Sequence, residues 1–481
     1  MLDNLKNKTI RAFFWSLSGQ LGQQSIVFVI SVILARLLEP YQFGLIGILS
    51  IFVALANTLL DFGFGSAIVQ RQNLEQKDLS TIFYFNVGTG ICLSLILFFT
   101  APLIASFFEI PQLSILARVL SANFIINSLA IVHGAILVKK IDFKTQVLIR
   151  LFSIVISGTI AITLAINGWG VWSLVIQTIS QNILNTILLW VISDWKPSAI
   201  FRFKSLKEIF GFSANIAGSS IINVIFDKLD IILVGKLYAP TDLGFYTRAM
   251  SLQMLPIKNT YRVLRRVMFP VLSKIQNDLE RLRSVYVKVI HVVAFISFPL
   301  MFGLLVVANP LVRVLLTDKW LPVVKYLQLL CLGGFLYPLS AINLNILLVK
   351  GRADIFFRLE IVKKVILTIA IIIGLKWGIV GLISAKVITS YIAFYLNIKY
   401  SGNMINYSIT QQLKDLFPYF VLSIIMAMLT YAVGLSFDNQ TVKLVIEIFT
   451  GVIIYYLLCK LFKIQALRDT IHIIKDFNLK Y

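Results

Sequence analysis

Charged side chains are scarce in this chain of 481 residues: aspartate, glutamate, lysine and arginine occupy 14% of positions, whereas hydrophobic residues occupy 58%. A soluble protein of this length needs a far more charged surface to stay in solution. Long polar stretches are also missing, because no loop between apolar segments exceeds about 20 residues. These absences exclude a soluble globular protein and leave no room for a folded domain outside a membrane.

Cysteine and histidine are rare as well, with three residues of each. The cysteines lie far apart in apolar segments without CxxC spacing, which argues against disulfides and metal sites and favours simple packing of Cys92, Cys331 and Cys459. The sequence contains no Walker loop, GxGxxG fingerprint, GxSxG elbow or HExxH motif. We therefore expect a protein that is not an enzyme, with no catalytic residue, no cofactor and no metal.

What the chain has in abundance is long apolar blocks. Each is about 20 residues long, the length that a helix needs to cross a hydrocarbon core ~30 Å thick. The blocks are continuous and lack the short alternating segments of a barrel. We predict an all-α polytopic membrane protein with about 14 transmembrane helices. The blocks lie near 12–37, 42–62, 80–106, 115–138, 147–166, 169–193, 208–235, 243–270, 287–308, 322–348, 356–375, 378–398, 416–435 and 441–463.

The net charge of +22 resides in the short loops between these blocks. Of the 44 lysines and arginines, 29 fall in one set of alternate loops and the two termini, and nine fall in the other set. Basic residues accumulate on the cytoplasmic side of membrane proteins, so we expect both termini to be cytoplasmic. Because the bases do not form one continuous surface, we do not expect a nucleic-acid partner.

A short internal repeat predicts two lobes. Residues 35–44 read ARLLEPYQFG, and residues 235–244, at an offset of 200, read GKLYAPTDLG. The shared proline and glycine predict the same tight turn in both copies. Repeats of this kind are typical of two-lobed transporters. We predict pseudo-symmetric six-helix lobes at 1–200 and 201–400, with two further helices and a cytoplasmic tail at 401–481.

The remaining six bases lie within apolar blocks, where an ionisable side chain costs at least ~2.5 kcal/mol and indicates a functional site. Lys258, Arg262, Arg265 and Arg266 share one helix face over about 12 Å. Guanidinium groups of this kind suit phosphate oxygens, which makes the four a candidate substrate site. The alternative is that Arg265 and Arg266 lie near the helix end and reach the lipid headgroups.

The preceding block, 208–235, carries two acids and a base near its middle, Asp227, Asp230 and Lys228. The two acids are candidates for an ion-coupling site or gate, and Lys228 is a candidate substrate-binding base. An inter-helix salt bridge that only holds the lobe together explains them equally well.

Four further candidates are tied to the repeat or to the first block. Arg36 and Lys236 occupy equivalent positions in the two repeat copies, where they cap a cavity or reach the outer headgroups. Gln20 and Gln24 in the first block carry amides that suit sugar hydroxyls but that also tie helices together in lipid.

Four stretches of the chain carry a family resemblance: LARLLEPYQFGLIGI (34–48), DFGFGSAIVQR (61–71), FDKLDIILVGKLYAPTDLGFYTRAMSL (226–252) and FPVLSKIQND (269–278). They resemble the polysaccharide transporter branch of the multidrug/oligosaccharidyl-lipid/polysaccharide exporter superfamily. Within that branch they look most like Wzx-type flippases of the colanic-acid and teichuronic-acid exporter kind.

The resemblance implies two lobes around a central cavity, with alternating access to the two sides of the bacterial cytoplasmic (inner) membrane. It implies a cargo of undecaprenyl-pyrophosphate-linked oligosaccharide, moved outward for the synthesis of surface polysaccharide such as O-antigen, capsule or exopolysaccharide. Membrane lipids, a polysaccharide polymerase and a chain-length regulator are the further expected partners. Two alternatives stay open: a multidrug/cation antiporter of the same superfamily, and a membrane glycosyltransferase or polymerase.

Overall fold

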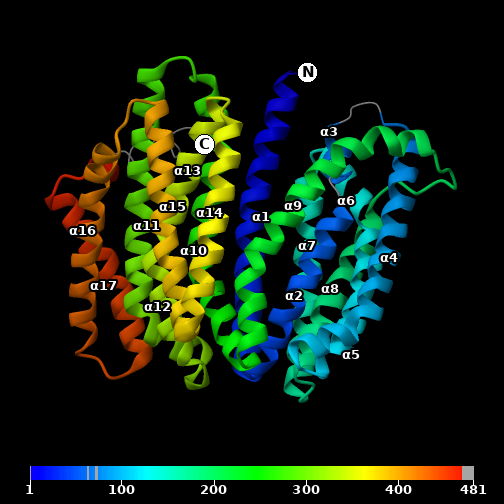
Figure 1. The fold of residues 1–481 in the computed structure, drawn as a ribbon, viewed down its shortest axis with the longest axis horizontal. Helices are drawn as coiled ribbons and strands as arrows, with labels where there is room; N and C mark the ends of the chain where they lie inside the picture. The colour runs from blue at the N-terminus through cyan, green and yellow to red at the C-terminus, as the bar shows by residue number, and fades with distance from the viewer. Residues whose placement is uncertain (1, 62–63, 71–73, 469–481) are drawn as a thin grey trace. The chain divides into compact units, whose positions relative to one another are not determined.

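A computed structural model describes residues 2–61, 64–70 and 74–468, and every regular element in them is a helix (Figure 1). The chain divides into two compact units, Met1–Gly244 and Phe245–Tyr481. The division falls within helix α10, which spans Pro240–Lys274. The all-helical fold predicted from the sequence is confirmed, whereas the lobe boundaries at 200 and 400 stay a prediction.

The first unit is built from helices that pack in pairs: α1 on α7, α4 on α5, α7 on α8 and α2 on α9. They are α1 (Leu2–Leu37), α2 (Pro40–Asp61), α3 (Phe64–Gln70), α4 (Gln76–Phe108), α5 (Gln112–Ser128), α6 (Ile131–Lys139), α7 (Phe143–Ile166), α8 (Val171–Ile192) and α9 (Phe203–Leu237).

In the second unit α11 is central, because α12, α16 and α17 all pack on it, while α14 packs on α15. Its remaining elements are α11 (Leu279–Leu316), η1 (Asp318–Trp320), α12 (Pro322–Gly334), α13 (Leu336–Val349), α14 (Ala353–Gly374), η2 (Leu375–Trp377), α15 (Gly378–Met404), α16 (Ile409–Gly434) and α17 (Gln440–Leu461).

Several helices begin at side chains that satisfy the free amides of the first turn. The N-cap oxygens accept hydrogen bonds from backbone N–H groups two or three residues further on, which anchors the start of α7, α11, α16 and α17. These caps are Asp142, Asp278, Ser408 and Asn439. Proline starts α2 and α10, at the position where its missing N–H costs nothing.

Eleven segments of the described chain are long and apolar enough to cross a membrane, so the protein is a multi-pass membrane protein. One of them, Ala353–Met404, contains both α14 and α15, which pack on each other after a turn at Gly378. Helices α9 and α10 are 35 residues each and are not among the eleven. The count of about 14 stays a prediction.

Two details differ from the sequence-based expectation. The block at 322–348 is divided at Phe335 into α12 and α13, because Pro338 has no N–H to donate to the carbonyl of Gly334. Cys331 and Cys459 are buried as predicted, but Cys92 is exposed on α4, so the packing prediction is wrong for that residue.

The two copies of the repeat meet in the first unit. A Cβ atom added to Gly44 would lie 1.8 Å from the carbonyl oxygen of Pro240, and one added to Gly244 would lie 2.0 Å from that of Pro40. The contact is reciprocal: the glycine of each copy lies against the proline of the other. Backbone therefore touches backbone where α2 and α10 begin, and no side chain fits between them.

We predict that Gly44→Ala destabilises the protein by about 1–3 kcal/mol, because the new methyl group overpacks a site that only a backbone shift can enlarge. Gly88→Ala is the matched control, since open space surrounds Gly88 and alanine favours a helix. Thermal unfolding in detergent measures both variants. Equal melting temperatures for the two would contradict the contact.

An ion pair links α4 to α9. The Nζ atom of Lys236, in the last turn of α9, lies 2.6 Å from Oε1 of Glu109, which caps the C-terminus of α4 in the left-handed conformation. Lys236 also lies over the ring of Phe107, 5.4 Å from its centroid. The hydrogen bond and charge of Lys236 lower the pKa of the Glu109 carboxyl below its ordinary value. A cation at this helix end is also favoured by the helix dipole.

The lowered pKa of Glu109 predicts a pH dependence. The stabilisation by the ion pair is present above the ordinary carboxyl pKa of ~4.3 and is lost as the pH falls through the lowered value. We expect Lys236→Met to melt below the wild type at pH 7, and the difference to shrink below about pH 4. Differential scanning fluorimetry from pH 3 to pH 8 measures this, and a difference that grows in acid would refute the assignment.

Candidate functional site

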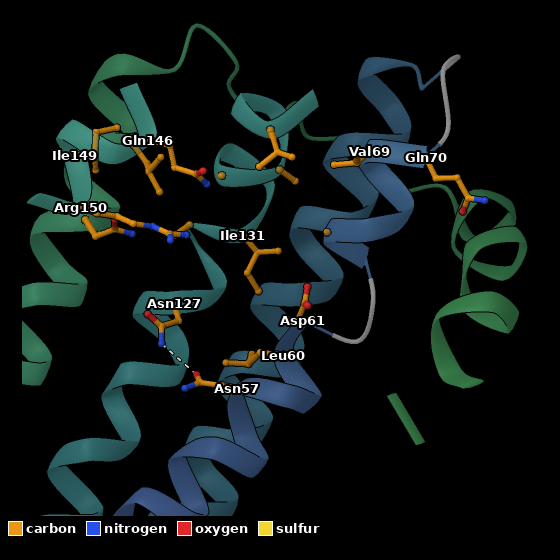
Figure 2. Close-up of a pocket in the computed structure, with 17 residues that line it drawn as sticks. Asn57, Leu60, Asp61, Val69, Gln70, Asn127, Ile131, Gln146, Ile149 and Arg150 are labelled. Atoms are coloured by element: carbon orange, nitrogen blue, oxygen red, sulfur yellow. Dashed lines mark hydrogen bonds between the residues drawn. The ribbon is translucent and has the colours of Figure 1, made fainter. Parts of the chain in front are cut away.

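A cavity of about 740 Å³ lies within the first unit. Its walls come from α2, α3, α5, α6, α7 and α8, and the break between α5 and α6 lies on it at Asn127, Ala130 and Ile131 (Figure 2). The sequence predicted one span over 115–138, and the structure divides that span where it faces the cavity. The volume falls in the range of small-molecule sites.

Amide side chains dominate the polar part of the lining. Five of them face the cavity from five helices, namely Asn57, Gln70, Asn127, Gln146 and Asn185. The Nδ2 atom of Asn127 donates to Oδ1 of Asn57 over 3.2 Å, which leaves each amide with further hydrogen-bonding capacity. Each amide both donates and accepts, as a ligand rich in hydroxyl groups requires.

One base and one acid also line the cavity. Arg150 reaches into it from α7, and Asp61 lies on the α2 side (Figure 2). Within the described part of the chain neither side chain forms an ion pair. Arg150 is therefore available to bind one anionic group with paired N–H donors. Leu60, Val69 and Ile149 supply apolar wall between the polar groups.

None of the predicted residues whose side chains the structure describes lines this cavity. Arg36 is exposed in the last turn of α1, and Lys236 is bound to Glu109. Gln20 and Gln24 are half-buried on α1, and the buried Oε1 of Gln24 has no hydrogen-bond partner among the described residues.

The acids of α9 occupy different surroundings. Asp227 is exposed, Lys228 is half-buried, and Asp230 is buried, with its Oδ1 accepting from the N–H of Ile231 over 2.8 Å. The four predicted bases of α10 lie on helical backbone, but their side chains are outside the described part of the structure; they are Lys258, Arg262, Arg265 and Arg266. The predicted roles of all these residues stay proposals.

The cavity residues were not singled out in the sequence. Arg150 was counted with the loop bases because it lies in the first turn of the block at 147–166, yet α7 begins at Phe143 and places Arg150 two turns inside the helix. The signal that identifies such a site is a polar side chain inside each of several alternate spans. Asn57, Asn127 and Asn185 lie in the second, fourth and sixth apolar blocks and fit that pattern.

Known proteins resemble the chain over most of its length. It is 28% identical over 452 residues to the lipopolysaccharide biosynthesis protein WzxC of Escherichia coli (strain K12), covering 91% of this chain and 90% of WzxC. It is 27% identical over 414 residues to the teichuronic acid biosynthesis protein TuaB of Bacillus subtilis (strain 168), covering 84% of this chain and 85% of TuaB. Against the succinoglycan biosynthesis transport protein ExoT of Rhizobium meliloti (strain 1021) it is 25% identical over 477 residues, covering 97% and 96%.

Solved structures show the same fold. The lipid II flippase MurJ in an inward closed conformation superposes with a TM-score of 0.73 at 18% identity, covering 95% of this chain and all of MurJ. A multidrug resistance MATE family transporter in an inward-facing conformation superposes with a TM-score of 0.65 at 17% identity, covering 80% of this chain and 94% of the transporter.

The family profile described as "Polysaccharide biosynthesis protein" matches residues 33–325, more than half of the chain. This span includes the repeat, the cavity and the start of the second unit. The resemblance seen in the sequence is thereby confirmed: the chain belongs to the polysaccharide biosynthesis protein family.

Proposed function

We propose that this protein is a flippase that moves a lipid-linked oligosaccharide across the bacterial cytoplasmic membrane by alternating access. The family match over residues 33–325 carries the proposal, because the similar proteins are named for the biosynthesis or transport of surface polysaccharides. The fold shared with a lipid II flippase agrees with it. Both termini are cytoplasmic in this proposal, in accord with the distribution of basic residues.

The cavity of the first unit suits the sugar part of such a cargo. Its five amides match hydroxyl groups, and Arg150 matches one anionic group. The undecaprenyl-pyrophosphate part requires more positive charge, and we assign it to Lys258, Arg262, Arg265 and Arg266. Arg36, Lys228, Lys236, Gln20 and Gln24 are further proposed contacts, and Asp227 and Asp230 a proposed gate. A polysaccharide polymerase and a chain-length regulator are the proposed protein partners.

A multidrug antiporter is the second candidate, because a MATE transporter shares the fold. A cationic drug needs acids in its site, and this cavity has one acid among five amides and an arginine. A glycosyltransferase needs a positioned acid or base, and the relatives are named for biosynthesis and transport rather than for sugar transfer. The cavity chemistry therefore favours the flippase.

Reconstitution tests the function directly. Purified protein in liposomes is supplied with a fluorescent undecaprenyl-pyrophosphate oligosaccharide in one leaflet, and its arrival in the other leaflet is followed by quenching. Movement well above that of protein-free liposomes supports the proposal. Failure to move it, together with transport of a cationic dye, supports the antiporter instead, and formation of a longer glycan supports a polymerase.

The α10 bases yield one prediction. Because a pyrophosphate in lipid needs cations, we expect the double variant Lys258→Ala/Arg262→Ala to lose at least tenfold in transport while still inserting in the membrane. Lys325→Ala/Lys376→Ala is the control, since it removes two exposed bases elsewhere in the second unit. Wild-type transport by the first double variant would refute the phosphate role.

Arg150 yields another prediction. A charge-assisted hydrogen bond contributes about 1.5–3 kcal/mol, so Arg150→Gln should weaken transport of a glycan with an anionic group roughly tenfold or more. Arg118→Gln is the matched control, because Arg118 is an exposed arginine of the first unit outside the cavity, over the ring of Phe98. Initial transport rates measure both, and equal rates would remove Arg150 from the site.

A further inference from the structure

A row of buried polar side chains runs between α11, α16 and α17 in the second unit. Their polar atoms have no well-formed hydrogen bond with any described residue, although the surrounding helices are apolar spans. Leaving one such group unsatisfied in a low-dielectric interior costs free energy, so four such groups on the facing helices α16 and α17 require an explanation. They are Ser423, Thr430, Glu447 and Tyr455, which we call the polar seam.

Glu447 is the ionisable member at one end of the seam. It lies two turns into α17 and is 1% exposed, and neither carboxylate oxygen has a hydrogen-bond partner among the described residues. A Cβ atom on Gly434 would lie 2.1 Å from its Oε1, so glycine at that position makes room for the carboxyl. The nearest charge is Lys443, whose Nζ lies 4.0 Å from Oε1, too far for a hydrogen bond.

Hydroxyl groups follow Glu447 along the seam. Thr430, one turn before Gly434 on α16, lies against Gly451, one turn after Glu447 on α17. Further along, the Tyr455 hydroxyl lies beside Ser423 and Cys459, and its ring packs against Phe295 of α11. A hydroxyl both donates and accepts, which is what proton transfer along a row requires.

The other end of the seam reaches a second cavity. His291 of α11 has its Nε2 3.8 Å from Oδ2 of Asp415, and its ring centroid lies 5.7 Å from that of Tyr419. His291 lines a cavity of about 470 Å³, together with Glu280, Arg283, Ser284, Val287, Lys288 and Gln465. The lining of this cavity is polar, and histidine is the side chain best suited to exchange protons near neutral pH.

The stretch of α16 that carries these groups is nearly as long as a membrane's hydrocarbon core is thick. From Asp415 to Gly434 there are 19 residues of α16, about 28 Å of helix, close to the ~30 Å thickness of a hydrocarbon core. The widest step is from Ser423 to Thr430, seven residues or about 10 Å along the helix, and the relay requires bridging water molecules there.

We propose that Glu447 is a proton-binding carboxyl and that the polar seam carries protons between it and the cavity at His291, coupling glycan transport to proton movement. In each step one O–H or N–H bond breaks as the next forms, so no group is oxidised and none is consumed. Lys443 stabilises the deprotonated carboxylate. The other titratable groups on the packed faces are Tyr455, Cys459, Tyr419, Asp415 and His291, and Arg313 in the last turn of α11 is paired with Asp318.

Carbodiimide labelling tests the proton-binding carboxyl without any glycan. Dicyclohexylcarbodiimide adds to protonated carboxyl groups in apolar surroundings, and peptide mass spectrometry locates the adduct. We expect labelling at Glu447 that falls at least tenfold between pH 6 and pH 9. Asp438, an exposed acid before α17, should stay unlabelled. Absence of a Glu447 adduct at every pH, or a yield independent of pH, overturns the proposal.

Transport under a pH gradient tests the coupling, which rests on the proposed flippase function. In liposomes we expect the gradient to change the transport rate of the wild type and of Asp438→Asn at least tenfold more than that of Glu447→Gln. Tyr455→Phe, which keeps the ring and removes the relay hydroxyl, should reduce the response as well. Thermal unfolding checks that each variant is folded.

The two experiments fail in distinguishable ways. If Glu447→Gln and Tyr455→Phe respond to the gradient as the wild type does, the coupling is wrong and the flippase function stands. If the wild type moves no lipid-linked glycan, the proposed function is wrong, while the labelling result still decides whether Glu447 binds a proton.

Discussion

The hydrocarbon core of a membrane offers no hydrogen-bond partner, and this constraint shapes the whole chain. It makes helices the only regular element in the described residues. It also makes each polar side chain inside a span informative. Such a group costs free energy unless it is paired or faces water, and an unpaired one indicates a function. Three arrangements of polar groups result in this protein. Lys236 and Glu109 form a pair, Arg150 and five amides line a cavity, and Glu447 lies in the seam without a hydrogen bond to any described residue.

The repeat shows how the same constraint acts on the backbone. Proline starts both α2 and α10 because its missing N–H costs nothing there, and glycine follows four residues later in each copy. The glycines let Gly44 lie against Pro240 and Gly244 against Pro40. The sequence match at an offset of 200 therefore reflects a direct contact between the copies and not only a common origin.

Sequence reasoning succeeded where the signal was continuous and failed where it was sparse. Long apolar blocks predicted the helices, and the repeat pointed to residues that touch. The cavity was missed because its amides are single residues in five separate helices, each too weak a signal alone. Arg150 was counted with a loop because it lies in the first turn of the apolar block, whereas the helix begins four residues before that block, after its cap Asp142. Glu447 escaped notice because Lys443, four residues earlier, makes it look like a surface ion pair.

The charge of the first cavity limits what part of the proposed cargo it can hold. Arg150 and Asp61 face the same space, and neither forms an ion pair with a described residue, so their charges nearly cancel in the field that a ligand meets. A pyrophosphate, with at least two negative charges, gains little from such a lining, whereas sugar hydroxyls gain from all five amides. The two ends of a lipid-linked glycan therefore require two places in the protein. Under the proposed function the amides hold the sugars, and the bases of α10 hold the phosphates.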